Sequence, residues 1–156
     1  MHLRCNARTR RCFVGMARRS RLSPSSTVAD VKWLDAEAIV AIHEDLLERW
    51  GGAPGGGHRG SSYEGVEAAT QAVKNSYYET VEELAAAYAV YIVQGHVFMD
   101  GNKRSGAAVL ATFMHGNDQP PKISWRDLFG AMVDLQKRSE DGEDTNRLIA
   151  WLAAKL

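Results

Sequence analysis

The segment TVEELAAAYAVYIVQ, from Thr80 to Gln94, is the most apolar helical stretch of this 156-residue chain. Thr80 precedes Glu83 by three positions, which is the spacing of a capping box at a helix N-terminus. In this motif the Thr80 hydroxyl accepts a bond from the Glu83 amide, and the Glu83 side chain bonds back to the Thr80 amide. The residues that follow are apolar on every side of a helix, and such a helix is buried. The segment therefore predicts a central, buried helix.

Helix signals recur on both sides of this segment. Asp35 and Ser124 are good N-cap residues, each directly before an amphipathic run. Ser61 or Ser62 caps another helix after a glycine-rich loop, and Thr145 starts the last. The expected helices span residues 36–50, 63–74, 81–94, 102–115, 125–138 and 145–156. Because no strand pattern of useful length is present, we expect an all-α bundle of about six helices.

Charge is distributed unevenly along the chain. Residues 1–29 contain seven arginines and no acidic residue, whereas residues 30–156 contain twelve basic and nineteen acidic residues, a net charge of minus seven. An apolar content of 45% over 156 residues suits a single core. We therefore expect a basic extension over residues 1–29 and one folded domain over residues 30–156. The acidic balance of that domain argues against direct nucleic-acid binding.

The basic extension allows several interpretations. It is rich in arginine and serine without acid, as a transit peptide is, so targeting or contact with RNA is one function. A disordered extension is the simpler interpretation, with translation starting at Met16 or a later site. Cys5 and Cys12 are too few for a disulfide framework, and the apolar run Ala85 to Val93 is about half as long as a membrane helix. We expect a cytoplasmic protein without a membrane segment.

The next loop, HVFMDGNKRSG at residues 96–106, is dense in chemically active side chains. It leads into an expected helix N-terminus, where free backbone amides bind anions such as phosphate. Asp100 is an oxygen ligand of the kind that Mg²⁺ uses beside nucleotide phosphates. His96 is a candidate general base. Lys103 and Arg104 oppose the helix dipole unless an anion lies over them.

These residue types alone leave a structural interpretation open. Asp-Gly-Asn is common turn chemistry, a lone histidine is usually structural, and Phe98 is a candidate core residue. The loop therefore predicts either a magnesium, phosphate and general-base site or an ordinary turn.

The whole string resembles the signature of the Fic/Doc family, H-x-F-x-D/E-G/A-N-K/G-R. The matching positions are His96, Phe98, Asp100, Gly101, Asn102, Lys103 and Arg104. From Leu34 to Asn117 the order and spacing of segments are also similar to those of death-on-curing (Doc) toxins. The resemblance implies a Fic/Doc-type helical bundle with a short extended flap.

One position of this signature separates two activities. Members that transfer AMP carry G-N-G-R-x-x-R, where the second Gly leaves room for the inner phosphates and the distant Arg holds the γ-phosphate. Lys103 and Ala107 occupy these two positions here. Doc-type members share both departures. The resemblance therefore implies that ATP binds in the opposite sense and gives its γ-phosphate to a target protein.

The resemblance also implies a role for each motif residue. His96 is the catalytic base that deprotonates a target hydroxyl, Asp100 holds Mg²⁺, and Phe98 packs inward and aims the loop. The implied phosphate-binding residues are Gly101, Asn102, Lys103 and Arg104. Gly101 stands where alanine is common in Doc members, and we expect it only to loosen the turn.

Other residues carry weaker expectations. The segment NSYYET, from Asn75 to Thr80, lies where the family has its flap, and the candidates for target binding are Asn75, Ser76, Tyr77 and Tyr78. Packing of both tyrosines onto the core is the alternative. His58 and Arg59 are candidates for reaching the nucleotide. His43 and His115 are expected to be ordinary core or surface residues. Four tryptophans at helical spacing are expected in the core, and a base-stacking platform is the alternative: Trp33, Trp50, Trp125 and Trp151.

The resemblance finally implies partners. These are a small Phd-like antitoxin of a type II toxin–antitoxin system and a translational GTPase target, elongation factor Tu, whose phosphorylation halts translation. The alternatives are AMP transfer by a Fic enzyme and a non-catalytic binding module that keeps the fold. The chain lacks the inhibitory-helix pattern of many Fic proteins, so self-inhibition by that route is not expected.

Overall fold

The computed structural model describes residues 30–52 and 59–156. Within these residues the chain forms six α-helices and no strand, so the predicted all-α fold is confirmed. The helices are α1 (Ala36–Trp50), α2 (Arg59–Lys74), α3 (Val81–Gln94), α4 (Asn102–Gly116), α5 (Trp125–Glu140) and α6 (Thr145–Ala153). The basic extension and His58 lie outside the described residues.

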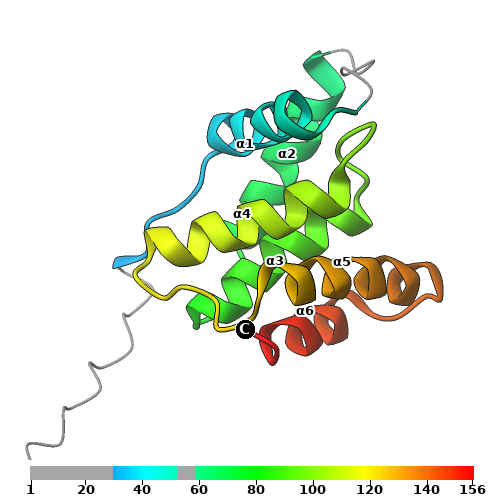
Figure 1. Ribbon diagram of the computed structural model, residues 1–156. Coiled ribbons are helices and arrows are strands. Elements are labelled where there is room, and N and C mark those ends of the chain that lie inside the picture. The colour runs from blue at the N-terminus through cyan, green and yellow to red at the C-terminus, as the bar shows by residue number, and fades with distance from the viewer. Residues whose placement is uncertain (1–29, 53–58) are drawn as a thin grey trace, which may run out of the picture.

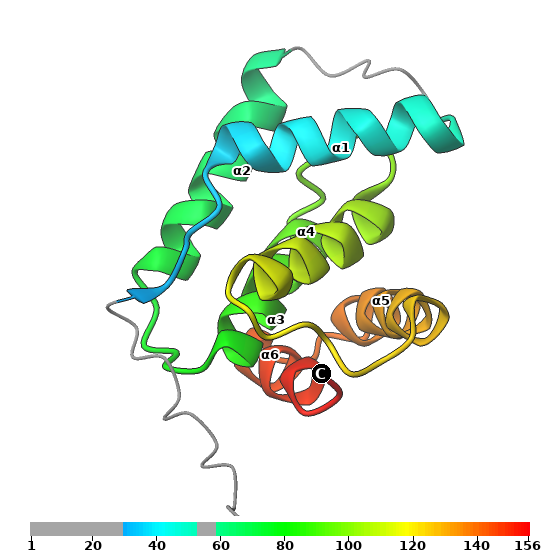
Figure 2. The ribbon, with the colours of Figure 1, turned by 60° about the vertical axis from the view of Figure 1, so that its left-hand side comes forward.

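Helix α3 is the centre of the molecule, as its sequence predicts. Ten of its fourteen residues are buried. Figure 1 shows α3 and α4 side by side in the middle, with α1 and α2 on one side and α5 and α6 on the other. In Figure 2, α1 lies across α2 and over α4. Helix α3 contacts α2, α4, α5 and α6, so its apolar faces are covered by four neighbours.

Small residues let α3 and α4 approach closely. A Cβ atom on Gly106 of α4 would lie 3.0 Å from Val93 Cγ2 and 3.5 Å from the carbonyl oxygen of Ala89, both in α3. Contacts as short as 3.0 Å require a neighbour to move, so this position favours glycine. The close contact fixes the first two turns of α4 against the end of α3, with the loop of residues 95–101 joining them.

Most helix ends follow the local signals in the sequence. The Asp35 side chain accepts a bond from the Ala38 amide, and the complete capping box is formed by Thr80 and Glu83. Ser124 caps α5 by accepting from the Asp127 amide. These bonds satisfy amides that have no partner inside the helix.

The largest differences from the predicted bounds are at the start of α2 and the end of α6. Helix α2 begins at Arg59, so Ser61 and Ser62 lie inside the helix and not before it. Serine and glycine are tolerated in a first turn because its amides need no intrahelical partner. Helix α6 is capped by Asp144, whose side chain accepts from two amides, and it ends at Ala153 and not at the chain terminus.

The expectation that all four tryptophans are core residues is wrong for two of them. Trp33 packs against Phe113 with ring centroids 6.3 Å apart, and Trp151 packs on the core beneath the Arg138 guanidinium. Trp50 and Trp125 are 73% and 52% exposed. They are the last residue of α1 and the first residue of α5, so the helix ends carry them past the core.

No helix in the two described ranges is both long enough and apolar enough to cross a membrane.

Candidate functional site

The loop of residues 95–101 turns the chain sharply between the buried helix α3 and α4. Its turn uses left-handed backbone at both ends, at His96 (φ 46°) and at Gly101 (φ 74°). Gly101 is the N-cap residue of α4, so its conformation sets the direction in which the helix starts. Its role is thus larger than the expected loosening of the turn. A histidine with positive φ is uncommon and costs free energy, so the fold holds His96 in a strained position with its side chain exposed.

Phe98 anchors the loop from below. It is 4% exposed, and its ring stacks on that of His43 in α1 with centroids 3.7 Å apart and an interplanar angle of 8°. The His43 Nδ1 atom lies 2.8 Å from the hydroxyl oxygen of Ser105 in the first turns of α4. Helix α1 therefore holds both the loop and the start of α4 through one buried histidine.

His43 was expected to be an ordinary core or surface residue, and no role beside the loop was assigned to it. The available signal was its place four residues after the buried Ile39, on the inward face of α1. A polar side chain on such a face needs a partner inside the protein. The sequence gives no direct indication that the partner is Ser105, because the contact depends on how α1 crosses α4.

Asn102 closes the loop into a compact turn. Its Oδ1 accepts a bond from the Phe98 amide at 2.9 Å, and its Nδ2 donates to the Phe98 carbonyl at 2.7 Å. Both polar ends of the side chain are therefore engaged with the loop backbone. Asn102 is expected to bind phosphate, and in the structure its side chain also shapes the turn.

The N-terminus of α4 carries no side-chain cap. Helices α1, α3, α5 and α6 are all capped by an Asp, Thr or Ser side chain, whereas Gly101 provides none for α4. The Asp100 side chain accepts from the Gly101 amide at 2.6 Å, one residue before the helix. The first amides of α4 have no intrahelical partner, and they form an anion-binding position of the kind that phosphate occupies.

Lys103 and Arg104 leave this first turn in different directions. Lys103 Nζ donates to the Gln136 side chain of α5 at 2.5 Å. Arg104 Nη1 donates to the carbonyl of Gly51 at 3.0 Å, at the C-terminal end of α1. The negative end of the α1 dipole thus offsets part of the repulsion that Arg104 meets at the α4 N-terminus.

The motif residues line one cavity of about 240 Å³. Its lining residues are His96, Met99, Asp100, Gly101, Asn102, Lys103, Arg104, Phe129 and Gln136. Six of the seven expected motif residues therefore meet here, and Phe98 lies buried beside them. Sequence reasoning missed Phe129 and Gln136, because α5 supplies them from more than twenty positions away.

The Asp100 carboxylate suits a magnesium ion that takes its other ligands from water and the phosphates of a substrate. No group of three or more His, Cys, Asp or Glu side chains suited to a metal occurs among the residues that the structure describes. Asp100 is exposed at the cavity, so its carboxylate is accessible to a hydrated ion. Mg²⁺ commonly uses one or two carboxylates together with water and substrate phosphates, and a preformed cage is not required.

The flap candidates lie outside this cavity. Residues 75–80 are neither helix nor strand, and Tyr77 is fully exposed. The Tyr78 hydroxyl donates to Asn146 of α6 at 2.8 Å, and partial burial raises the pKa of Tyr78. Tyr78 is thereby tied to the fold, whereas Tyr77 is free to contact a partner. The Ser76 hydroxyl donates to the Val73 carbonyl, and Asn75 is exposed.

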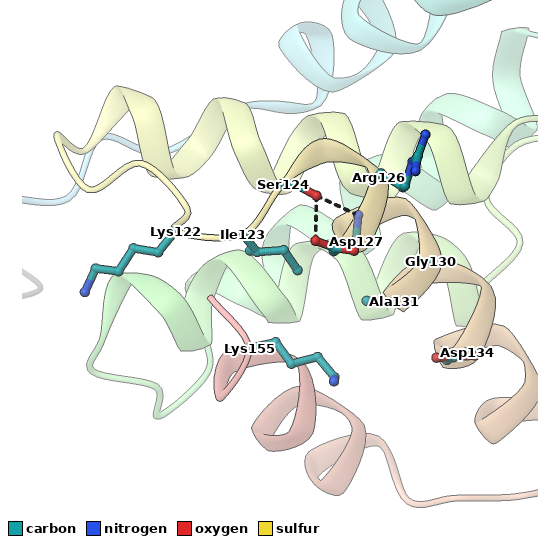
Figure 3. Close-up of a pocket in the computed structure, with 9 residues that line it drawn as sticks. All are labelled: Lys122, Ile123, Ser124, Arg126, Asp127, Gly130, Ala131, Asp134 and Lys155. Carbon is teal, nitrogen blue, oxygen red and sulfur yellow. Dashed lines mark hydrogen bonds between the residues drawn. The ribbon is translucent and has the colours of Figure 1, made fainter.

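A second hollow of about 660 Å³ lies at the start of α5 and near the chain terminus. Figure 3 shows Lys122, Arg126 and Lys155 at its edges and the bond from Ser124 to Asp127 within it. Its cations are interspersed with carboxylates, and it shares no residue with the motif cavity. It is therefore not part of the candidate site. His115, in the last turn of α4, is exposed and also lies apart from it.

Comparison with known proteins covers the helices that carry the loop. The model of the Fic/DOC family matches residues 33–114, which run from just before α1 almost to the end of α4. "Protein kinase doc" of Escherichia phage P1 is 30% identical over 89 residues, which are 56% of this chain and 69% of that protein. Helices α5 and α6 lie beyond the matched family residues.

Proposed function

The chain belongs to the Fic/DOC family, and on this premise we propose that it transfers the γ-phosphate of ATP to a hydroxyl group of a target protein. One observation carries the proposal: the uncapped N-terminus of α4 opens into the cavity that also holds His96, Asp100 and Lys103. Phosphoryl transfer needs a site that binds the phosphates, a ligand for the metal ion and a group that accepts the proton of the attacking hydroxyl.

The phosphates of ATP bind at the first turn of α4. The free amides of that turn, the Lys103 ammonium and the Arg104 guanidinium offset the charge that develops on the phosphate oxygens. Asp100 holds Mg²⁺, which supplies further neutralisation when it is bound. Gln136 holds the Lys103 ammonium at the cavity through their hydrogen bond.

His96 acts as the general base. Its side chain is exposed at the cavity, so a target Ser or Thr hydroxyl has access to it. The proton of that hydroxyl moves to the imidazole as the oxygen forms a bond to the γ-phosphorus. The bond between the γ-phosphorus and the bridging oxygen breaks, and ADP leaves. A positioned base of this kind contributes on the order of 10²- to 10⁴-fold to the rate.

Lys103 favours γ-phosphate transfer over AMP transfer. Its side chain crosses from α4 to Gln136 of α5 and fills space beside the first turn. A lysine there obstructs the inner phosphates in the orientation that AMP transfer needs. Ala107 adds no distant cation, and it is buried.

The name of the relative, "Protein kinase doc", supports the proposed phosphate transfer. We propose that the protein is a toxin of a type II toxin–antitoxin system that halts translation by phosphorylating elongation factor Tu. A Phd-like antitoxin holds it inactive. Tyr77, which is fully exposed in the flap, contacts the target.

The proposal is tested by incubating the full chain with cell lysate, Mg²⁺ and ATP labelled at either the α- or the γ-phosphate. We expect the γ-label on a protein band and no α-label. Transfer of the α-label instead makes the protein an AMP transferase. No transfer of either label, with the protein folded, leaves a binding module.

A further inference from the structure

A further cavity, mainly apolar and separate from the hollow at the start of α5, adjoins the motif cavity. It has a volume of about 200 Å³ and is lined by Leu46, Trp50, Arg104, Trp125 and Phe129. Arg104 and Phe129 line both cavities, so the two share a wall. We propose that this apolar cavity is the nucleobase site, in which the base of ATP stacks on Trp50 and Trp125. The inference rests on the proposed function, because it takes ATP as the substrate.

The two tryptophans are placed as a ligand site requires. They come from the end of α1 and the start of α5, which are 75 positions apart in the sequence, yet they line the same cavity. Both are more than half exposed, and large exposed aromatic surfaces commonly mark a binding site. Base–aromatic stacking buries such surface and is available to every base, because each base has a π-face.

Size and continuity favour a base as the occupant. A volume of about 200 Å³ lies below the range of roughly 300 to 1,000 Å³ for pockets that hold whole drug-sized ligands. It suits one flat ring system. Phosphates at the α4 N-terminus and a base in the next cavity belong to one molecule, so occupying both sites costs a single loss of translational freedom.

The lining also predicts the selectivity of the site. Arg104 is its single charged residue, and that guanidinium already donates to the Gly51 carbonyl. Few polar groups remain to read the edge of a base, so stacking dominates. We therefore expect ATP and GTP to bind with similar affinity, and both to bind more tightly than tripolyphosphate, which has no base.

The test compares Mg²⁺·ATP with Mg²⁺·tripolyphosphate by titration calorimetry on the full chain. Trp50→Ala and Trp125→Ala should each weaken ATP binding by about 5- to 160-fold, the range that base stacking supplies. Binding of tripolyphosphate should be unchanged. Trp50→Phe should keep most of the ATP affinity, because it keeps an aromatic face. Trp151→Phe is the matched control, since Trp151 packs on the core beneath Arg138 and should leave both affinities unchanged.

Several outcomes overturn the inference. Equal binding of ATP and tripolyphosphate by the wild-type protein places the base elsewhere. Equal losses for both ligands in Trp50→Ala show a structural effect. An ATP affinity that is unchanged in both Trp50→Ala and Trp125→Ala rules out a base in this cavity. An apolar segment of a protein partner is then the expected occupant.

Transfer of the γ-label separates this inference from the proposed function. If ATP binds in a tryptophan-dependent way but no label is transferred, the base site stands and the transferase function falls. If label is transferred with unchanged ATP affinity in both alanine variants, the function stands and the base site falls.

Discussion

The Nδ1 atom of His43 lies 2.8 Å from the Ser105 hydroxyl oxygen, although 62 positions separate the two residues in the sequence. His43 is 8% exposed, and one face of its ring stacks on the ring of Phe98. One buried histidine of α1 therefore touches both the candidate loop and the helix that the loop starts. The shape of the site depends on this contact, even though His43 does not line the motif cavity.

A double-mutant cycle should measure the strength of this contact. His43→Ala and Ser105→Ala should show a coupling free energy of about 1 kcal/mol in urea unfolding, because a buried neutral hydrogen bond contributes about 0.5 to 1.5 kcal/mol. His43→Ala paired with Ser76→Ala is the control, since Ser76 bonds only the Val73 carbonyl and should be additive. A coupling near zero for His43 and Ser105 contradicts the account.

The stability of the fold should fall as His43 becomes protonated. Burial, and to a smaller extent Arg104, lowers the pKa of His43 below 6.5, although Glu44 and Asp100 act in the opposite direction. Below about pH 6.5 the unfolded chain therefore binds a proton that the folded chain does not. The stability that uncharged His43 contributes is fully present above that pH. It is lost as the pH falls toward the pKa of His43 in the folded chain.

Urea unfolding at pH 7.5 and pH 5.5 measures this effect. The loss of unfolding free energy between the two pH values should be smaller in His43→Gln, which has no titrating ring, than in the wild-type protein. Other acid-sensitive groups act in both proteins, so the difference between the two losses isolates His43. An equal loss in both proteins shows that His43 does not contribute.

Gly101 should resist substitution more than a glycine inside a helix. Its φ of 74° is left-handed, so Gly101→Ala should lower the unfolding free energy by about 1 kcal/mol. The His43 ring, 3.7 Å from the added Cβ, makes only an ordinary contact. Gly130→Ala is the opposite control. It lies within α5 with nothing within 4 Å, and it should raise stability by about 0.5 to 1 kcal/mol. Equal effects of both changes contradict the assigned backbone role.

Residues near one another in the chain could be predicted well from the sequence. Asp35, Ser124 and the Thr80–Glu83 pair cap the helices that they were expected to cap, because a capping bond spans three residues. The motif loop is equally local, and six of its seven matched residues line one cavity.

Contacts between distant helices could not be predicted in the same way. Gln136, Phe129 and His43 join the loop only because α5 and α1 pack around α4. Trp50 and Trp125 have the helical spacing of core residues, yet their positions at helix ends expose them. Periodicity gives the face of a helix but does not show where the neighbouring helix stops.

ATP should stabilise the fold through Lys103. At a hundredfold excess over the dissociation constant, Mg²⁺·ATP should raise the unfolding free energy by about 2.7 kcal/mol. The increase in melting temperature should shrink in Lys103→Ala, because that ammonium lines the motif cavity. Lys122→Ala, in the separate hollow at the start of α5, is the control and should keep the full increase. If the increase in melting temperature is unchanged in Lys103→Ala and shrinks in Lys122→Ala, the phosphates bind in the hollow at the start of α5.

The rate of γ-phosphate transfer by His96→Gly tests most directly that the loop is a catalytic site. The His96 side chain is exposed and its backbone is left-handed. Glycine relieves the strain of this backbone in the folded chain but adds freedom to the unfolded chain. The free energy of unfolding should therefore change by less than about 1 kcal/mol. His115→Ala, an exposed histidine at the far end of α4, is the control and should retain wild-type transfer. We expect His96→Gly to stay folded, to bind Mg²⁺·ATP and to lose about 10²- to 10⁴-fold in transfer rate. Transfer at the wild-type rate by His96→Gly contradicts this expectation.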